Sequence, residues 1–188
     1  NECPRRRKGS LPHRNLKKTA GTWSIIKRSK KSETDIKTGL KVMERNWSVI
    51  VVAAGRGSRM GTKESKQFLE LNGNPLFLRA IDTFGRFGAT AEIIVVTGAA
   101  DVERCERYIR EADCPLVKTV VAGGAERQNS VYEGLKQASS PWVMVHDGVR
   151  PFIREEDIGA CYAQMQSSGA AVLAVPVKDT IKIVKGNA

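Results

Sequence analysis

The sequence has few of the residues from which metal centres and disulfide frameworks are built. Its only thiols and imidazoles are those of Cys3, Cys105, Cys114, Cys161, His13 and His146. They include no CxxC pair and no spacing typical of a zinc site. The thiols therefore indicate a reducing compartment, and we expect Cys161, on the apolar face of a predicted helix, to serve core packing.

Long hydrophobic runs are also absent. No apolar run approaches the roughly 20 residues that span a bilayer, so we expect no membrane partner. Hydrophobic residues make up 41% and charged residues 27% of the chain, close to the averages for globular proteins. At 188 residues, the chain is long enough to bury a core and is expected to form one globular domain.

Acidic residues are scarce only at the start of the chain. The net charge is +11, but residues 1–42 hold 13 of the 31 basic and only 3 of the 20 acidic side chains. Residues 43–188 are left with 18 basic and 17 acidic side chains. A groove that follows nucleic-acid phosphates needs a basic face on the folded body, so nucleic acid is not an expected partner. Nucleic-acid binding through the basic leader remains an alternative.

Residues 1–42 are predicted to be a disordered leader, because they are basic, poor in apolar residues and without a clear period. Met43 lies just before the first apolar run, so this leader is interpreted as upstream sequence outside the working protein. A plastid-type transit peptide is the alternative, although no initiator Met and no amphipathic Arg/Ser stretch supports it. The expected location is cytoplasmic.

From residue 47 onward, short apolar runs alternate with segments of helical period. Runs rich in Val and Ile predict parallel strands buried on both faces at 48–53, 93–97, 116–121, 142–145 and 171–175. One helix is predicted to open with Pro75 as its first helical residue. Others are predicted over 101–111, over 128–137, with Val131 and Leu135 facing inward, and around 158–165. This succession predicts an α/β fold with a mostly parallel sheet flanked by helices, and ligands beyond the carboxyl ends of its strands.

The first predicted strand leads into the glycine-rich segment AAGRGSRMG at 53–61. Glycines let the backbone approach a phosphate chain, and a tight turn is the alternative explanation. Arg59 and Lys66 favour the phosphate site, because a guanidinium and an ammonium suit a transferring phosphoryl group and a departing pyrophosphate. Dinucleotide binding is less favoured, since GxGxxG is absent and Glu70, the nearest acid at the required distance, is not predicted to lie in a strand.

Two further segments follow predicted strands. GGAERQNS at 123–130 has glycines for contact with a flat base and Ser130 to hydrogen-bond a base edge, or it is an ordinary strand-to-helix turn. In WVMVHDGVRP at 142–151, Asp147 follows a strand and is a candidate Mg2+ ligand, and Arg150 could hold an acceptor phosphate. A plain ion pair between Asp147 and Arg150 is the alternative, and His146 is interpreted as structural.

These segments resemble the 2-C-methyl-D-erythritol 4-phosphate cytidylyltransferase family of the non-mevalonate isoprenoid pathway. The matching pieces are AAGRGSRMG at 53–61, KQF at 66–68 with Leu71 and Gly73, GGAERQNSV at 123–131, VHDGVRPF at 145–152 and PVKDTIK at 176–182. The resemblance implies a Rossmann-like nucleotidyltransferase fold and, in the full-length form, a homodimer. It also implies an Mg2+-dependent enzyme that transfers CMP from CTP to methylerythritol phosphate, giving 4-diphosphocytidyl-2-C-methyl-D-erythritol and pyrophosphate.

The same resemblance assigns roles to individual residues. It makes Arg59 and Lys66 the catalytic cations. It implies CTP contacts from Ala53, Ala54, Gly55, Gly57, Gly124, Ala125, Ser130 and Gly148. It places Asp147, Arg150 and Thr180 at the acceptor sugar phosphate, with Asp147 also near the metal.

Departures from the family pattern limit these expectations. Gly148 stands where the family commonly has Ala, and the chain stops at Ala188, soon after Thr180, before further family residues that place the acceptor. We therefore expect a carboxy-terminally truncated fragment that binds CTP but is weakly active or inactive. A ribitol 5-phosphate cytidylyltransferase and an inactive nucleotide-binding module are the alternative interpretations.

Overall fold

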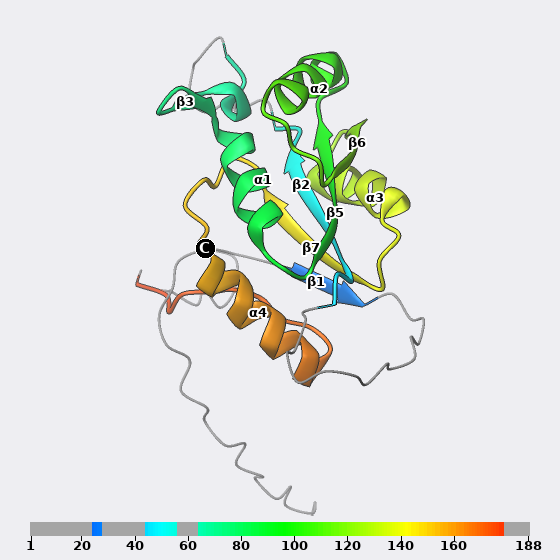
Figure 1. Cartoon of the computed structure of the whole chain (residues 1–188), viewed down its shortest axis with the longest axis vertical. Helices are drawn as coiled ribbons and strands as arrows, with labels where there is room; N and C mark the ends of the chain where they lie inside the picture. Colours follow the sequence, from blue (N-terminus) through cyan, green and yellow to red (C-terminus); the bar gives the residue numbers. More distant parts are fainter. Residues whose placement is uncertain (1–23, 28–43, 56–63, 179–188) are drawn as a thin grey trace, which may run out of the picture.

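The structure, a computed structural model, describes residues 24–27, 44–55 and 64–178. Within these ranges a five-stranded sheet has the strand order β1-β7-β2-β5-β6 (Figure 1). Its strands are β1 (Ser24–Lys27), β2 (Trp47–Ala53), β5 (Thr90–Thr97), β6 (Val117–Ala122) and β7 (Trp142–Asp147). All neighbours pair in parallel except β1, which runs antiparallel to β7. The predicted α/β fold with a mostly parallel sheet is confirmed.

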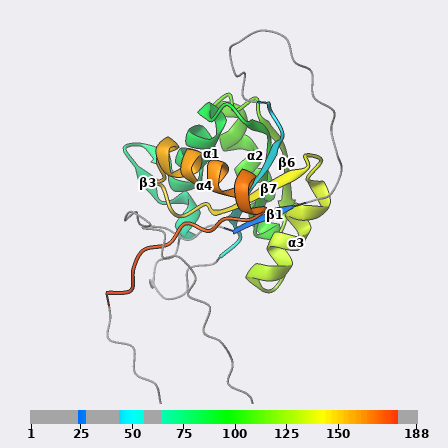
Figure 2. The same ribbon diagram turned by 90° about the horizontal axis from the view of Figure 1, so that it is seen from below.

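In the described part of the chain, four α-helices cover the two faces of the sheet. They are α1 (Leu76–Arg86), α2 (Val102–Glu111), α3 (Arg127–Gln137) and α4 (Glu155–Ser168). Side chains of α1, α2 and α4 join one core cluster, whereas α3 packs against the opposite face (Figures 1 and 2). Each predicted helix is present, and α1 begins one residue after Pro75, which is its N-cap. None of the helices in the described ranges has the length and apolar character needed to cross a membrane.

Alternate residues of the central strands enter the two cores, as expected of strands buried on both faces. Val51 lies in the cluster with α1 and α4, and the adjacent Ile50 lies in the cluster with α3. Cys161 is buried in the first cluster, which confirms its predicted packing role. Val131 and Leu135 are partly buried against the second cluster, so their inward orientation is also confirmed.

Helix α3 approaches the sheet closely at Gly134. A Cβ atom at this position would lie 2.6 Å from Cγ2 of Ile50 and 3.0 Å from Cγ2 of Val96. Such separations are shorter than carbon–carbon contact, so the glycine lets the helix rest directly on β2 and β5. The consequence is a short distance between the helix and the strands beneath it.

A small hairpin and two 3-10 turns complete the described part. The turns are η2 (Lys66–Phe68) and η3 (Ala99–Asp101), and the hairpin joins β3 (Glu70–Leu71) to β4 (Asn74–Pro75). Asn72 and Gly73 have φ angles of 54° and 76°, as a two-residue hairpin turn requires. Glu70 is the first residue of β3, so it does lie in a strand, contrary to expectation. That strand belongs to the separate hairpin and not to the main sheet.

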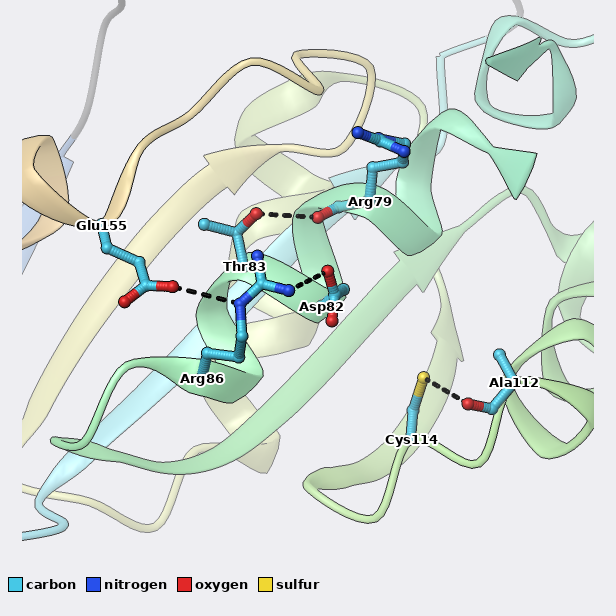
Figure 3. Close-up of polar contacts among 7 residues, drawn as sticks. All are labelled: Arg79, Asp82, Thr83, Arg86, Ala112, Cys114 and Glu155. Atoms are coloured by element: carbon cyan, nitrogen blue, oxygen red, sulfur yellow. Dashed lines mark hydrogen bonds and ion pairs between the residues drawn. The ribbon is translucent and has the colours of Figure 1, made fainter. Parts of the chain in front are cut away.

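Helix α4 is tied to α1 by a surface guanidinium. Arg86 donates to Glu155 of α4 at 3.1 Å and to Asp82, one turn earlier in its own helix, at 2.6 Å (Figure 3). All three side chains are about half exposed, so these pairs orient the helix more than they stabilise the fold. Hydrophobic contacts of Ile158, Cys161 and Met165 fix α4 in place.

Two sequence-based predictions about strands are wrong. Residues 171–175 form no strand, and Val172 and Val175 are exposed. A strand requires a free sheet edge, and the edge of β7 that lies away from β2 is occupied by β1. The four residues of β1 belong to the segment predicted to be a disordered leader, so that prediction fails for 24–27. The other leader residues lie outside the described ranges.

Candidate functional site

A cleft of about 340 Å³ opens at the carboxyl ends of the parallel strands. Such an end is the usual ligand position in open α/β sheets, because the loops that leave parallel strands meet there. Segments that follow β2, β6 and β7 form the walls, together with the start of η2. The lining residues are Val52, Ala53, Ala54, Gly55, Lys66, Gly124, Ala125, Glu126, Arg127, Ser130, Asp147 and Val149.

Lys66 brings a cation to this cleft. It is the first residue of η2, where the backbone N–H of Leu69 donates to the carbonyl of Lys66. The next two residues, Gln67 and Phe68, are buried at 1% and 3% exposure, so they anchor the turn in the core. Within the described residues no hydrogen bond or ion pair engages the Lys66 ammonium group, which leaves it available to an anionic ligand.

The start of α3 forms a second wall of the cleft. Glu126 and Asn129 make a capping box, in which Asn129 Oδ1 accepts from the N–H of Glu126 at 3.2 Å. A Cβ atom at Gly123 would lie 2.5 Å from Ser130 Oγ and 2.9 Å from Cβ of Ala54, so only glycine fits there. The positive end of the α3 dipole therefore reaches the cleft beside the loop that follows β2.

Ser130 is more enclosed than its predicted role in base recognition requires. The residue is 2% exposed, and its hydroxyl donates to the carbonyl of Glu126 at 3.2 Å. The alternative of an ordinary strand-to-helix turn thus describes part of what is found. Backbone groups of Gly124 and Ala125, which are exposed in the cleft, are better placed for contact with a base.

Asp147 lies between two arginines. Its Oδ1 atom accepts from Arg127 Nη2 at 2.8 Å and Nε at 3.1 Å, and its Oδ2 atom lies 3.0 Å from Nε of Arg150. Asp147 is 22% exposed, against 58% for Arg127 and 48% for Arg150. The ion pair considered as an alternative for Asp147 and Arg150 is present, and the carboxylate organises two guanidinium groups at the mouth of the cleft.

His146 supports this turn from inside the core. Its Nε2 atom lies 3.1 Å from the carbonyl oxygen of Arg150, and its ring packs edge-on against Phe84 with centroids 5.2 Å apart. Burial lowers the pKa of His146 to about 3, so the imidazole is neutral at physiological pH. The structural interpretation of His146 fits this geometry, because the neutral ring holds the Asp147–Arg150 turn.

Gly148 brings two strand ends together behind the cleft. Its N–H donates to the carbonyl of Val52 at 2.8 Å, and a Cβ atom there would lie 3.0 Å from Cγ1 of Val51. An alanine at this position would need a shift of a few tenths of an ångström from Val51. The departure from the family pattern at Gly148 therefore slightly relieves packing under the site.

Most of the predicted site residues that the structure describes meet at one place. Ala53, Ala54, Gly55, Lys66, Gly124, Ala125, Ser130 and Asp147 all line the cleft. Gly148 lies directly behind it, and Arg150 reaches its edge through Asp147. The predicted residues Gly57, Arg59 and Thr180 lie outside the described ranges.

Arg127 is a cleft residue that the sequence-based prediction missed. It belongs to the GGAERQNSV segment, for which the sequence predicts only backbone and serine contacts. Its position in the first turn of α3 points its guanidinium across the cleft to Asp147. The only sequence signal was a basic residue at the start of a helix that follows a glycine pair.

The described residues offer few ligands for a permanently bound metal ion. They hold no group of three or more His, Cys, Asp or Glu side chains suited to a metal. Mg2+ usually keeps several waters and takes one or two carboxylates plus substrate phosphates. Asp147 fits that limited role, provided that an arginine releases one of its oxygens, so the cleft suits an ion carried in on phosphates better than one held by protein alone.

A second cavity, of about 350 Å³, lies between α1 and the turn from α2 to β6. Two of its charged side chains, Arg86 and Asp82, already pair with each other, and Cys114 at its rim approaches the carbonyl of Ala112 at 3.8 Å (Figure 3). None of the predicted site residues lines it. The cleft at the strand ends is therefore the better candidate for chemistry.

A mostly parallel α/β sheet with a glycine-lined, cation-bearing cleft at its carboxyl end defines the class, a Rossmann-like nucleotidyltransferase fold. The family model for 2-C-methyl-D-erythritol 4-phosphate cytidylyltransferase matches residues 47–188, and the chain belongs to that family.

Curated relatives with this name agree with the assignment. The chain is 45% identical over 141 residues to the protein of Clostridium botulinum (strain Eklund 17B / Type B), covering 74% of this chain and 63% of the relative. It is 40% identical over 143 residues to that of Halalkalibacterium halodurans, covering 76% of this chain and 63% of the relative. The chain thus spans just under two thirds of the length of these relatives.

Solved structures agree in fold. The 4-diphosphocytidyl-2C-methyl-D-erythritol synthase of Anaerococcus prevotii is 28% identical with a TM-score of 0.59, over 75% of this chain and 60% of that one. The 2-C-methyl-D-erythritol 4-phosphate cytidylyltransferase of Thermus thermophilus is 34% identical with a TM-score of 0.53, over 75% and 59%. A CMP:2-keto-3-deoxy-manno-octonic acid synthetase complexed with CTP, 14% identical with a TM-score of 0.52 over 67% and 48%, supports the fold alone.

Proposed function

We propose that the protein transfers CMP from CTP to 2-C-methyl-D-erythritol 4-phosphate, releasing pyrophosphate and giving 4-diphosphocytidyl-2-C-methyl-D-erythritol. The observation that carries the proposal is the meeting of Lys66, the start of α3 and the Asp147 arginine pair in one cleft. Family membership over 47–188 supports the choice of reaction.

The reaction needs no enzyme nucleophile. An oxygen of the acceptor phosphate attacks the α-phosphorus of CTP, one P–O bond forms, and the bond to the bridging oxygen of the β-phosphate breaks as pyrophosphate leaves. Positioning and charge neutralisation provide most of the rate enhancement in such displacements. This cleft offers side chains and backbone N–H groups for both.

The charged and glycine-rich groups of the cleft have separate parts in this mechanism. Lys66 neutralises charge on the triphosphate as pyrophosphate departs. Gly124 and Ala125 let the backbone approach the cytosine. Arg127 and Arg150 exchange Asp147 for substrate phosphate oxygens, since a guanidinium binds carboxylate and phosphate through the same forked geometry.

Mg2+ is proposed as the divalent cation of the reaction. It would enter on the triphosphate, with Asp147 as its candidate protein ligand, and would neutralise phosphate charge. The predicted homodimer of the full-length form and the predicted cytoplasmic location stay predictions.

The test is pyrophosphate release from CTP and Mg2+ with methylerythritol phosphate and, separately, ribitol 5-phosphate. This chain is assayed beside a version extended to the length of its relatives. The Lys66→Ala variant should lose at least about tenfold in rate, because it lacks one transition-state cation. The matched control is Lys136→Ala, which removes an exposed lysine from the last turn of α3, away from the cleft.

The outcomes separate the interpretations. Turnover with methylerythritol phosphate that depends on Lys66 supports the proposal. Turnover with ribitol 5-phosphate alone would mean that ribitol 5-phosphate, and not methylerythritol phosphate, is the acceptor. CTP binding without turnover in both lengths, with either acceptor, would leave a nucleotide-binding module and refute the transferase function.

A further inference from the structure

Lys66 lies in a segment that helix α2 holds from both sides. Before it, Glu64 accepts from both arms of Arg104, with Oε1 at 2.8 Å from Nη1 and Oε2 at 3.1 Å from Nη2. After it, Gln67 donates to Asp101, the N-cap of α2, at 3.3 Å. The segment that carries the cation is thus tied to α2 on either side of the cation itself.

Arg104 makes a second contact with the same segment. Its guanidinium carbon lies 3.9 Å from the ring centroid of Phe68 and 5.8 Å from that of Tyr108. The two rings stack with centroids 6.0 Å apart, and Phe68 is 3% exposed. A guanidinium that forks to a carboxylate while it covers an aromatic face has little freedom to move. One side chain therefore joins residues 64 and 68 around Lys66.

The charge on Arg104 is already used within this cluster. The hydrogen bond from Arg104 is the main reason that the pKa of Glu64 lies below its usual range, so the carboxylate is ionised and the pair is neutral as a whole. Arg104 is not among the residues that line the cleft. Any effect that it has on a ligand must pass through the segment it holds.

We propose that Arg104 is a positioning residue that holds Lys66 at the triphosphate. The inference rests on the proposed function, because it takes Lys66 to contact the phosphates beyond the α-phosphate of CTP. A fixed cation costs no reorganisation when charge develops on the leaving group, whereas a cation on a loose turn must first be ordered.

The first experiment measures CTP and CMP affinity by calorimetry for the wild type, Arg104→Met and Arg107→Met. Arg107 is the matched control, since it is exposed on the same helix and carries the same charge. Arg104→Met should weaken CTP binding about fivefold and leave CMP binding unchanged, because cation–aromatic and forked contacts have modest individual strength. Arg107→Met should change neither.

A double-mutant cycle with Lys66→Ala tests whether the effect passes through Lys66. Once the ammonium is gone, Arg104→Met should cause no further loss of CTP affinity. An equal further loss in that background, or an equal loss of CTP and CMP affinity in the single variant, would overturn the inference.

A ligand-free measurement separates this inference from the proposed function. The amides of Phe68 and Leu69 donate to the carbonyls of Ser65 and Lys66 at 3.0 and 3.2 Å, so hydrogen exchange reports on the turn directly. Arg104→Met should speed exchange at these two amides and leave α3 unchanged. Arg104→Lys should do the same to a smaller degree, because lysine keeps the charge but not the fork.

The two readouts fail in different ways. A wild type that binds neither nucleotide refutes the proposed function, and the exchange rates then still decide whether Arg104 holds the turn. Unchanged exchange in Arg104→Met refutes the positioning role whatever the affinity for CTP.

Discussion

The ionised carboxylate of Glu92 should make the free energy of unfolding depend on pH in the acid range. It lies at the opposite end of the sheet from the cleft, with the residue 8% exposed. One carboxylate oxygen accepts from Ser48 Oγ at 2.5 Å and from the N–H of Ser139 at 2.6 Å, and the other lies 2.8 Å from Nζ of Lys118. The carboxylate thus connects β2, β5, β6 and the turn before β7.

These contacts outweigh the cost of burial. Burial raises the pKa of Glu92, but the hydrogen bonds from Lys118, Ser139 and Ser48 together lower it from 4.5 to about 2. A difference of that size between unfolded and folded states corresponds to about 3 kcal/mol of stabilisation. Since the folded-state pKa is depressed, this contribution is complete above pH 4.5 and is lost as the pH falls toward 2.

The substitution Glu92→Gln isolates the charge. A glutamine carbonyl can still accept from Ser48 and Ser139, but its amide cannot pair with Lys118. We expect Glu92→Gln to lower the free energy of unfolding at pH 7 by up to about 3 kcal/mol and the deficit to shrink as the pH falls from 4.5 toward 2. Urea unfolding followed by circular dichroism measures it at each pH.

Glu111→Gln is the matched control, because Glu111 is exposed at the end of α2 and should change the unfolding free energy little at any pH. A deficit for Glu92→Gln that stays constant from pH 7 to the acid end would refute the reasoning. Such a result would mean that geometry, and not the ionised carboxylate, holds this junction.

Further predictions concern the glycines, the helix cap and the buried imidazole. Gly85→Ala, where a Cβ meets nothing within 4 Å, should raise the unfolding free energy by about 0.5–1 kcal/mol because glycine is a poor helix former. Gly123→Ala should instead lower it by about 1–3 kcal/mol and weaken CTP binding, and unchanged binding would argue against a close backbone approach at the cleft. Asn129→Ala should lower the free energy of urea unfolding by about 1 kcal/mol, because it removes the half of the α3 capping box that accepts from the N–H of Glu126. His146→Gln should destabilise most at pH 7 and progressively less from pH 6.5 toward 3, because in that range the unfolded wild type binds a proton that the buried imidazole, with a pKa of about 3, does not bind. A loss that grows with acid would contradict this.

The central strands and the helices could be predicted because their signals are local. β2 and β5 are runs of Val and Ile that only a doubly covered sheet buries, and α1 shows a stripe of Phe77, Ile81 and Phe84. The cleft followed from the rule that loops at the carboxyl ends of parallel strands meet. These features need no knowledge of distant contacts.

The features that sequence reasoning missed depend on pairs far apart in the chain. Residues 171–175 have the composition of a strand, but a strand forms only where it can pair with a neighbour. The edge of β7 is already paired with β1, which comes from a basic segment that was not predicted to form a strand. Arg127 and Asp147 are 20 positions apart and Arg104 and Glu64 are 40 apart. Neither arginine has a local pattern that would reveal its partner.

The glycine beneath α3 has a mechanical consequence. At Gly134 the helix backbone meets Ile50 and Val96 with no side chain of its own in between, so the helix has little room to slide over the sheet. Two turns earlier, the helix begins at Arg127, a residue of the cleft, directly after the cleft residues Gly124, Ala125 and Glu126. A ligand bound at this end of the helix therefore also restrains its contacts with Ile50, in the middle of β2, and Val96, near the end of β5. Nucleotide binding in the cleft should therefore slow hydrogen exchange of the buried amides of β2 and β5, so these central strands would report on binding at a distance.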